Sequence, residues 1–365
     1  MAFYCFSHRI HFNFVFLKMI SSENFMHRCF DLAKSGLGMV APNPMVGALL
    51  VHDKKIIGEG FHHEFGKAHA EVNAINDAEK NYPEKISSSE LYVNLEPCSH
   101  YGKNPPCADL IIQRGIRKVF ISNYDTNPLV AGKGIEKLRA AGIEVVTDIL
   151  SEEGRKLNKR FFTFHEQKRP FIILKWAQTP DGFIAPVTKE RFQISGVQSQ
   201  ELVHKWRSEE QSVLVGTETA LTDNPQLNVR FWSGKNPIRI VIDSKLLLPE
   251  ILNLFNHEIQ TIIFNSIKTE EQNNISFVKL NFKTSILNQL LSHLHSKNIQ
   301  SIIIEGGTAT LQKFIDENLW DEARIFTAPK KLVYGIKAPV LSIDNFNIEN
   351  LFVGEDELKI INNFS

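Results

Sequence analysis

The chain has 365 residues, of which 43% are hydrophobic and 22% charged, a composition typical of a globular protein long enough for two domains. Lys plus Arg and Asp plus Glu each number 41, which argues against a basic surface for nucleic-acid backbones and favours a small-molecule substrate. No apolar run approaches the roughly 18 to 20 residues needed to cross a membrane. Four cysteines, two of them in a metal-binding pattern, fit a reducing cytoplasm better than a disulfide framework.

The first 18 residues differ from the rest of the chain. They are rich in aromatic residues, are interrupted by His, Arg, Asn and Lys, and lack the small-residue cleavage site of a signal peptide. We interpret residues 1–18 as an upstream extension without a domain and Met19 as an alternative start, and we assign Cys5 no function.

Hydrophobic spacing predicts alternating helices and strands over residues 19–165. This alternation favours a layered α/β domain with a partly parallel sheet, whose site residues lie in loops at strand ends and at helix starts. The expected helices cover 23–35, the segment beginning with HAE at 69, 108–115 and 134–142, and the expected strands cover 46–52, 56–61, 90–95, 118–122 and 143–149.

Residues 151–168 are predicted to form a helix and then a linker, which places the domain boundary near Glu166. A second α/β domain would then cover residues 166–365, with the polar stretch 266–275 as a surface loop. Its expected strands are 171–177, 212–216, 238–243, 261–265, 301–307 and 322–329, and its expected helices are 197–209, 283–297 and 308–319.

A His-x-Glu pair and two cysteines carry the strongest chemical signal. His69 and Glu71 precede Cys98 and Cys107, and Pro97 stands directly before the first cysteine. Taken singly, the histidine could be structural, and the cysteines could form a disulfide or be buried thiols. Zinc deaminases bind Zn²⁺ through one His and two Cys, leave the fourth position for water, and use a Glu that is not a ligand to move protons. The combined pattern predicts one zinc held by His69, Cys98 and Cys107, with Glu71 as the proton shuttle.

Eight residues, SHYGKNPP, separate the two cysteines, which is longer than the two residues of the short P-C-x-x-C form. With this loop, the segments NPMVG (43–47), GEGFHH, HAE, LEPCSHYGKNPPC and NPLVAGKG resemble the bifunctional deaminase–reductase family of riboflavin biosynthesis. The resemblance runs from about Glu23 to about Lys331. It implies an N-terminal cytidine-deaminase-like α/β/α domain and a C-terminal dihydrofolate-reductase-like α/β domain.

The same resemblance implies one Zn²⁺ per chain, NADPH and two reactions. The first is hydrolytic deamination of 2,5-diamino-6-(5-phosphoribosylamino)pyrimidin-4(3H)-one. The second is NADPH-dependent reduction of the ribosyl group of 5-amino-6-(5-phosphoribosylamino)uracil to ribityl. We therefore expect phosphoribosyl pyrimidines as partners, with no nucleic acid and no membrane, a cytoplasmic location and a homo-oligomer.

In the first domain, the resemblance assigns Asn43 and His62 to the pyrimidine substrate. From the residues alone, Asn43 is explained equally well as a turn residue beside prolines. His100 and Lys103 lie in the loop between the cysteines and could reach the substrate phosphate, although a solvated charge explains Lys103 equally well.

In the second domain, the resemblance divides the expected ligands between substrate and cofactor. The substrate residues would be Arg207, Leu227, Arg230 and Glu305, and the NADPH residues would be Gln178, Thr219, Asp223, Ser244, Gly306, Gly307 and Thr308. An Arg can hold a phosphate through paired N–H groups. The sequence has no G-x-G-x-x-G fingerprint, so a Rossmann domain is not predicted, and no side chain is identified as the reductase's general acid. The sequence departs from the family pattern at Asn104, Thr126, Thr179, Pro180, Arg191 and Gln193.

Two rival interpretations stay open at this point. One is an RNA or nucleobase deaminase with an unrelated C-terminal domain, which would need a basic groove for a single strand. The other is a non-catalytic module whose zinc is structural, with His100 as the fourth protein ligand that such sites normally have.

Overall fold

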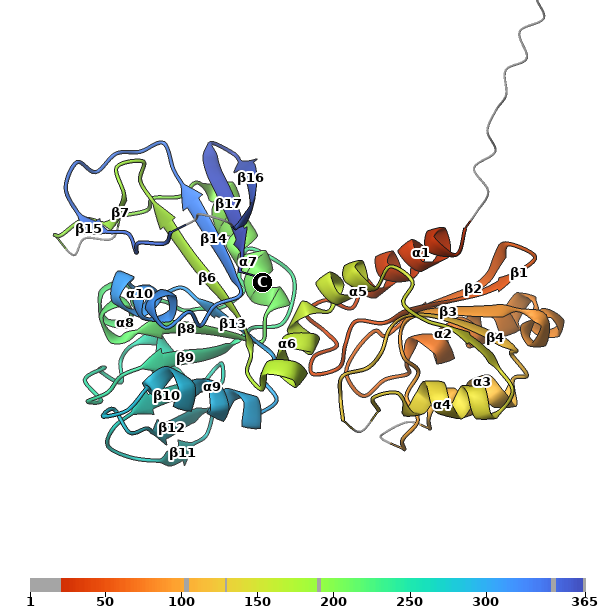
Figure 1. The fold of residues 1–365 in the computed structure, drawn as a ribbon. Coiled ribbons are helices and arrows are strands. Elements are labelled where there is room, and N and C mark those ends of the chain that lie inside the picture. Colours follow the sequence, from red (N-terminus) through yellow and green to blue (C-terminus); the bar gives the residue numbers. More distant parts are fainter. Residues whose placement is uncertain (1–20, 102–104, 129, 189–191, 343–345, 364–365) are drawn as a thin grey trace, which may run out of the picture.

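The computed structural model describes residues 21–101, 105–128, 130–188, 192–342 and 346–363. These residues form two α/β units, with helix α6 (Lys159–Gln167) between them (Figure 1). The expected extension 1–18, Met19, Lys103, Asn104 and Arg191 lie outside the described residues. None of the helices in the described ranges combines the length and the apolar character that crossing a bilayer requires.

The first unit is built on a five-stranded sheet of order β2-β1-β3-β4-β5. Strands β1 and β2 form an antiparallel hairpin that turns through Asp53 and Lys54, both at positive φ, and β3, β4 and β5 are parallel. The sheet is therefore partly parallel, as the sequence predicts. The strands are β1 (Gly47–His52), β2 (Lys55–Phe61), β3 (Glu90–Leu95), β4 (Lys118–Asn123) and β5 (Glu144–Val146).

Helices cover both faces of this sheet, because successive strand residues point to opposite sides. Leu91 and Val93 of β3 pack with apolar residues of α2, α3 and α4, whereas Tyr92 packs with α1 and with residues flanking α5. Cys29 is a residue of α1 and lies in the core, as is usual for a free cysteine. The helices are α1 (Ser22–Lys34), α2 (Ala70–Asn81), α3 (Cys107–Gln113), α4 (Lys133–Ala140) and α5 (Ser151–Leu157), and the 3₁₀ helix η1 (Pro83–Ser88) follows α2.

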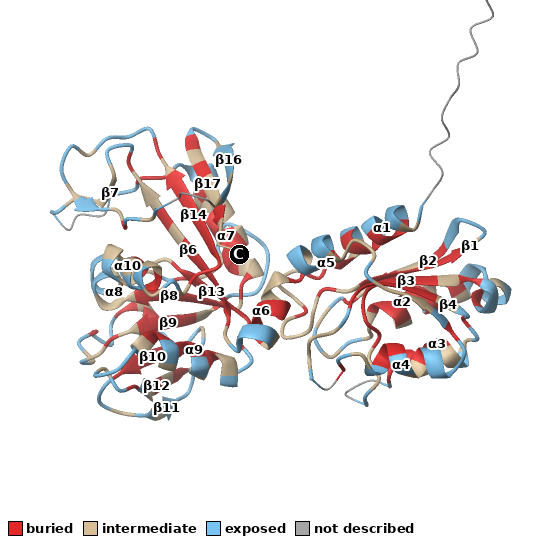
Figure 2. Ribbon diagram, in the orientation of Figure 1, coloured by how far each residue is buried: buried red, intermediate tan, exposed pale blue. Residues whose placement is uncertain are grey.

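The second unit is built on a ten-stranded sheet of order β11-β12-β10-β9-β8-β13-β6-β14-β17-β16. The seven neighbouring strands β12, β10, β9, β8, β13, β6 and β14 run parallel to one another. Antiparallel strands form both edges, β11 beside β12 and β17 with β16 beside β14. The central strands are buried on both faces, as Figure 2 shows. The strands are β6 (Phe171–Gln178), β8 (Ser212–Gly216), β9 (Ile238–Ile242), β10 (Thr261–Asn265), β11 (Glu270–Gln272), β12 (Ile275–Lys279), β13 (Ser301–Ile304), β14 (Glu322–Thr327), β16 (Asn347–Val353) and β17 (Asp356–Asn362), and β7 (Phe183–Ala185) pairs separately with β15 (Ile336–Lys337).

Apolar helices pack on both sides of this second sheet. On one side, α9 and α10 contribute leucines and Phe314 to a cluster with Ile172 and Leu174, and on the other side Trp206 of α7 packs with Ile173. The helices are α7 (Val197–Glu209), α8 (Thr217–Asp223), α9 (Ile286–Ser296) and α10 (Thr308–Asp316), with the 3₁₀ helix η2 (Asn253–Phe255).

Two expectations about local structure are wrong. The stretch 266–275 is a surface segment but contains strand β11, which pairs antiparallel with β12 through Glu271 and Ser276. The segment 151–168 forms two helices, α5 and α6, instead of a helix and a linker. The two helices meet at Asn158, whose φ of −99° and ψ of 28° interrupt the helical geometry.

Charged residues attach α6 to the second unit. Arg160 forms a bidentate pair with Glu210, whose side chain is 0% exposed, and its Nε lies 2.7 Å from Oε2. Lys159 pairs with Glu322 on β14, which also accepts from Arg324. The helix that follows the first unit therefore carries ion-pair partners of the second.

Candidate active sites

The starts of two helices and the end of one strand bring the predicted metal ligands together. His69 is the N-cap residue of α2, Cys98 lies three residues beyond β3, and Cys107 is the first residue of α3. Glu96 holds the neighbouring loop, because its buried carboxylate accepts backbone N–H groups of Asp125, Gly132, Gly134 and Ile135 at 2.8 to 3.2 Å.

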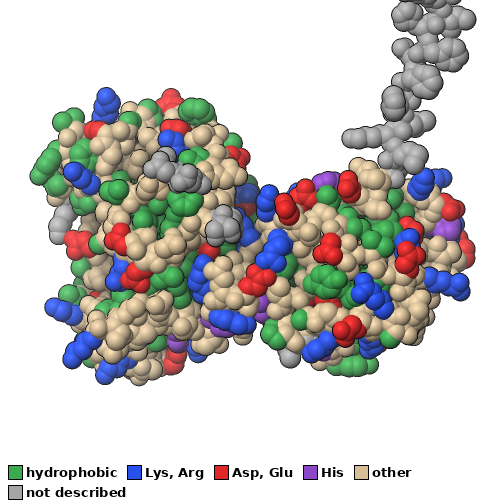
Figure 3. Space-filling view, viewed as in Figure 1, with side chains coloured by type: hydrophobic (Ala, Val, Ile, Leu, Met, Phe, Trp, Pro, Cys, Tyr) green, Lys and Arg blue, Asp and Glu red, His purple; other side chains and the backbone are tan. Residues whose placement is uncertain are grey.

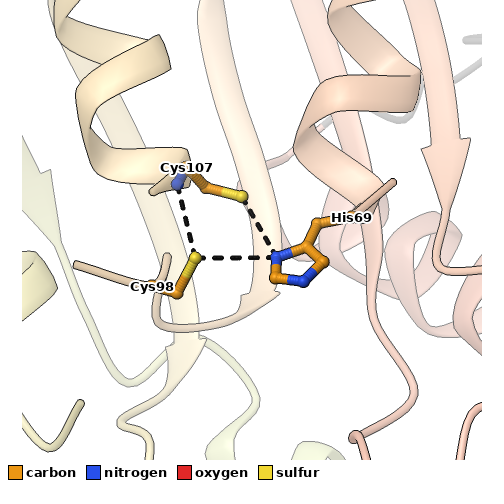
Figure 4. A group of neighbouring side chains, drawn as sticks. All are labelled: His69, Cys98 and Cys107. Carbon is orange, nitrogen blue, oxygen red and sulfur yellow. Dashed lines mark hydrogen bonds between the residues drawn. The ribbon is translucent and has the colours of Figure 1, made fainter. Parts of the chain in front are cut away.

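The donor atoms fit a tetrahedral zinc ion. His69 Nδ1 lies 3.6 Å from Cys98 Sγ and 3.3 Å from Cys107 Sγ (Figure 4). Zinc–sulfur bonds of about 2.3 Å and zinc–nitrogen bonds of about 2.0 Å at tetrahedral angles separate such atoms by about 3.5 Å. The backbone N–H of Cys107 also points at Cys98 Sγ, at 3.3 Å, and hydrogen bonds from Cys107 and His69 lower the pKa of the Cys98 thiol although burial opposes the shift.

The described residues offer no fourth protein ligand to this group. His69, Cys98 and Cys107 have donor atoms within 4.8 Å of one another, and His100 is not part of the group although it lines the adjoining cavity. Both cysteines are free thiols, which disagrees with the disulfide alternative. The described residues therefore offer three donor atoms to a metal, whereas structural zinc sites normally have four protein ligands.

Glu71 lies in the first turn of α2, two residues after His69, and is 3% exposed. Burial raises the pKa of its carboxyl. Glu71 lines a cavity of about 300 Å³ together with His69 and Cys98, so its carboxyl group borders the space where a substrate would meet the metal.

Asn43 and His62 line the same cavity and contact each other. His62 Nδ1 lies 3.0 Å from the Ala68 carbonyl, so this nitrogen carries the hydrogen and Nε2 accepts from Asn43 Nδ2 at 3.1 Å. Burial lowers the pKa of His62, which favours this neutral form. Because Nδ2 of Asn43 contacts His62, the Oδ1 atom of its amide is the atom that can accept a hydrogen bond from a ligand.

Several other residues line this cavity without having been predicted from the sequence. Asp125 follows β4, and burial raises the pKa of its carboxyl to about 7. Its place just beyond a parallel strand was a usable signal, because ligands bind at such strand ends. Part of the wall comes from α6 and from the segment before β13, including Phe161, His165 and Gln300, and no local sequence pattern connects these residues to residues 43–107.

A second cavity, of about 850 Å³, lies in the second unit and contains all four predicted substrate residues, Arg207, Leu227, Arg230 and Glu305. Arg207 is buried, and its Nε and Nη2 each donate to Glu305 at 2.7 Å. Lys175 lies 3.9 Å from the same carboxylate and was not identified from sequence, although a lysine inside the apolar run FIILKWA was a signal. Arg230 is exposed, in contrast to Arg207.

The predicted cofactor residues follow the carboxyl ends of neighbouring parallel strands, where ligands of open α/β sheets bind. Thr219 and Asp223 line the second cavity, whereas the other five do not. Those five lie just past or at the ends of β6, β9 and β13: Gln178, Ser244, Gly306, Gly307 and Thr308. Gly307 has a φ of 49°, and a Cβ there would lie 3.1 Å from Thr219 Oγ1, so the Gly-Gly-Thr turn adjoins the cavity. This glycine-rich turn at the start of α10 suits a phosphate group of a dinucleotide.

Both units match known protein families. Residues 19–123 match the cytidine and deoxycytidylate deaminase zinc-binding region, and residues 170–342 match the RibD C-terminal domain. The chain is 40% identical over 343 residues to the riboflavin biosynthesis protein RibD of Aquifex aeolicus, covering 93% of each chain. It is 38% identical to the protein of the same name from Actinobacillus pleuropneumoniae, covering 88% of this chain and 87% of that one.

Solved structures agree over nearly the whole chain. The diaminohydroxyphosphoribosylaminopyrimidine deaminase/5-amino-6-(5-phosphoribosylamino)uracil reductase of Thermotoga maritima is 37% identical, with a TM-score of 0.85 over 93% of this chain and 98% of that one. Acinetobacter baumannii RibD is 31% identical, with a TM-score of 0.84 over 94% and 99%. The match of the second unit contradicts the rival with an unrelated C-terminal domain. On the face that Figure 3 shows, acidic and basic side chains are interspersed.

Proposed function

Because the chain belongs to the RibD family of riboflavin-biosynthesis deaminase–reductases, we propose that it catalyses two consecutive steps on phosphoribosyl pyrimidines. The first is deamination of 2,5-diamino-6-(5-phosphoribosylamino)pyrimidin-4(3H)-one, and the second is NADPH-dependent reduction of 5-amino-6-(5-phosphoribosylamino)uracil to its ribityl form. The observation that carries the proposal is the His69–Cys98–Cys107 group with buried Glu71 beside it, in a chain whose second cavity is separate.

In the first cavity, His69, Cys98 and Cys107 would hold the zinc, which when bound supplies a Lewis acid that lowers the pKa of water. The Glu71 carboxylate would move a proton from that water to the ring nitrogen and then to the leaving amine, because it borders the cavity and is not needed as a ligand. Asn43 would accept from an exocyclic amine through Oδ1, since His62 engages its Nδ2.

In the second cavity, two cations and one carboxylate form a buried polar group. Glu305 is flanked by Arg207 and Lys175, and although burial alone would raise its pKa, their charges lower it to about 2. A carboxylate with this pKa is ionised at neutral pH and would accept hydrogen bonds from ribose hydroxyls. We assign the substrate phosphate to exposed Arg230 in preference to Arg207, whose paired N–H groups already bind Glu305. NADPH supplies the hydride, so the residues around it orient the two reactants.

Incubation of the purified full-length chain with the diaminopyrimidine, with and without NADPH, tests the proposal. Ammonia should appear without NADPH, and NADPH should be oxidised only once deaminated product is present or added. Elemental analysis should find one zinc per chain. Ammonia release that requires NADPH, or oxidation of NADPH by the diaminopyrimidine before any ammonia appears, would contradict the order of the steps.

We also propose a reducing, cytoplasmic location and a homo-oligomeric state. Free Cys29, Cys98 and Cys107 support the first part, and oxidation of the last two would destroy the metal site. The edge strand β16, with Phe352 80% exposed, supports the second part, since unpaired apolar edges commonly mark interfaces. Sedimentation of the purified chain checks the oligomeric state.

A further inference from the structure

Gln300 connects the second unit to the cavity of the first. It stands directly before β13 and is 3% exposed. The second unit fixes its backbone on both sides, because its N–H donates to Gln211 Oε1 at 2.6 Å and its carbonyl accepts from the Phe171 N–H at 2.8 Å. The residue is therefore a rigid part of the reductase sheet.

The side chain of Gln300 reaches across to the deaminase unit. Its Nε2 donates to the Pro42 carbonyl at 2.6 Å, and Gln300 lines the deaminase cavity together with Asn43. Pro42 and Pro44 have no N–H and a fixed φ, so a displacement at Pro42 passes to the residue between them. The backbone of that residue, Asn43, is otherwise held by the bond from its N–H to the Val40 carbonyl at 2.9 Å.

Asn43 must keep one orientation for its amide to be useful. Its Nδ2 donates to His62 Nε2, and His62 is itself fixed by the Ala68 carbonyl, so the direction of Asn43 Oδ1 depends on where its backbone lies. The Gln300 side chain of the second unit donates to the carbonyl of the preceding residue, Pro42, and so fixes the backbone position of Asn43. This chain of contacts runs from the reductase sheet to the wall of the deaminase cavity.

We propose that Gln300 of the reductase unit is a positioning residue for deamination, acting through the Pro42 carbonyl on Asn43. The inference rests on the proposed deaminase activity of the first cavity. Gln300 touches no reacting atom, and it affects binding of the pyrimidine because Asn43 contacts the ground state and the transition state alike. The deaminase cavity is consequently complete only with the second unit docked on it.

The test compares full-length Gln300→Met and Gln300→Glu, which keep the side-chain length but lack the N–H donor, with Gln272→Met. Gln272 is an exposed residue of β11 that lines neither cavity, so it is a matched control. Both Gln300 variants should raise the KM of ammonia release about fivefold to tenfold, the loss expected for one hydrogen bond, with kcat little changed. Zinc content and the kinetics of the reductase step should stay at wild-type values, and Gln272→Met should change KM less than twofold.

A double-variant cycle separates positioning from a general loss of structure. In an Asn43→Ala background, Gln300→Met should have no further effect on KM, since the residue through which it acts is gone. Additive effects of the two substitutions, an unchanged KM in both Gln300 variants, or equal losses in both reactions would overturn the proposal. Absence of ammonia release from the wild-type chain would instead reject the deaminase assignment, so the two failures are distinguishable.

Discussion

Glu71 and the predicted metal ligand His69 lie within one turn at the start of α2, and we expect them to have separable roles. Glu71→Gln should retain zinc and lose at least about a hundredfold in the rate of ammonia release, because an amide cannot accept and return a proton. Reduction of already deaminated substrate should continue at the wild-type rate. Cys107→Ala serves as the contrast, since it should lose the metal itself. Metal analysis and both assays on the two variants check this, and near-normal ammonia release by Glu71→Gln would exclude it as the shuttle.

The two arginines of the second cavity should respond differently to removal. Arg230→Ala takes away an exposed side chain and should raise the KM of the reductase substrate about tenfold or more without lowering the melting temperature. Arg207→Ala leaves Glu305 buried without its bidentate partner, and should lower the melting temperature as well as activity. Thermal unfolding and substrate titration at saturating NADPH measure both effects. A raised KM without loss of stability in Arg207→Ala, and a lower melting temperature in Arg230→Ala, would instead assign the substrate phosphate to Arg207.

The residues of the predicted metal site could be identified from the sequence, whereas the side-chain contacts between residues far apart in the chain could not. The prediction of His69, Cys98 and Cys107 as zinc ligands with Glu71 as proton shuttle follows from the residue types and their order, because few other chemistries use that set in that order. The bond between Arg207 and Glu305 joins residues 98 positions apart, and no local pattern encodes it. Glu96 lies inside the motif LEPC. The four backbone N–H groups that donate to its carboxylate belong to residues 125–135, and only the folded structure shows that these residues lie beside it.

Asn158, between α5 and α6, fixes the backbone of the segment that precedes β1. Asn158 accepts from the Met45 N–H at 2.8 Å and donates to the Met45 carbonyl at 2.9 Å, and it is buried. Asn158→Ala leaves that N–H without a side-chain acceptor, which should cost about 1 to 3 kcal/mol of stability. Differential scanning calorimetry of the zinc-loaded chain should show a lower melting temperature, whereas exposed Lys156→Ala should not.

Long elements with clear periodicity were predicted well, and short ones were not. Helices α1, α7 and α9 and the apolar strands of both sheets match the expected ranges within a few residues. Strand β11 has three residues and is polar, and α8 has seven, so neither displays a full hydrophobic period. The pairing of β17 with β14 depends on tertiary contacts that the local sequence does not contain.

The contacts of α6 decide where the second unit can be separated. A fragment from residue 167 lacks Lys159 and Arg160, the partners of buried Glu322 and Glu210. A fragment from residue 158 keeps both pairs, and we propose this start in place of the boundary at Glu166. The shorter fragment should be less stable by about 3 to 5 kcal/mol. Chemical denaturation and NADPH-dependent reduction without zinc compare the two fragments, and equal stability would favour the original boundary.

Acid should weaken the same junction. Burial alone would raise the pKa of Glu322, but Arg324 and Lys159 outweigh it and lower the value to about 2 from its usual 4.5. Because the folded pKa is depressed, the stabilisation is present above about pH 4.5 and is lost as the pH falls towards 2. The difference in unfolding free energy between wild type and Glu322→Gln should therefore shrink over this range. A constant difference between pH 5 and pH 2.5 would show that the carboxylate charge contributes little.

Strand β13 has a consequence for how such a chain can change during evolution. Gln300 at its amino end lines one cavity and Glu305 just past its carboxyl end lines the other, so about 16 Å of buried strand lies between these two wall residues. One inserted or deleted residue within it would shift a wall of both cavities and turn its apolar side chains to the wrong face. Length variation should instead accumulate in the turn of the β11–β12 hairpin, whose residues are exposed and line neither cavity.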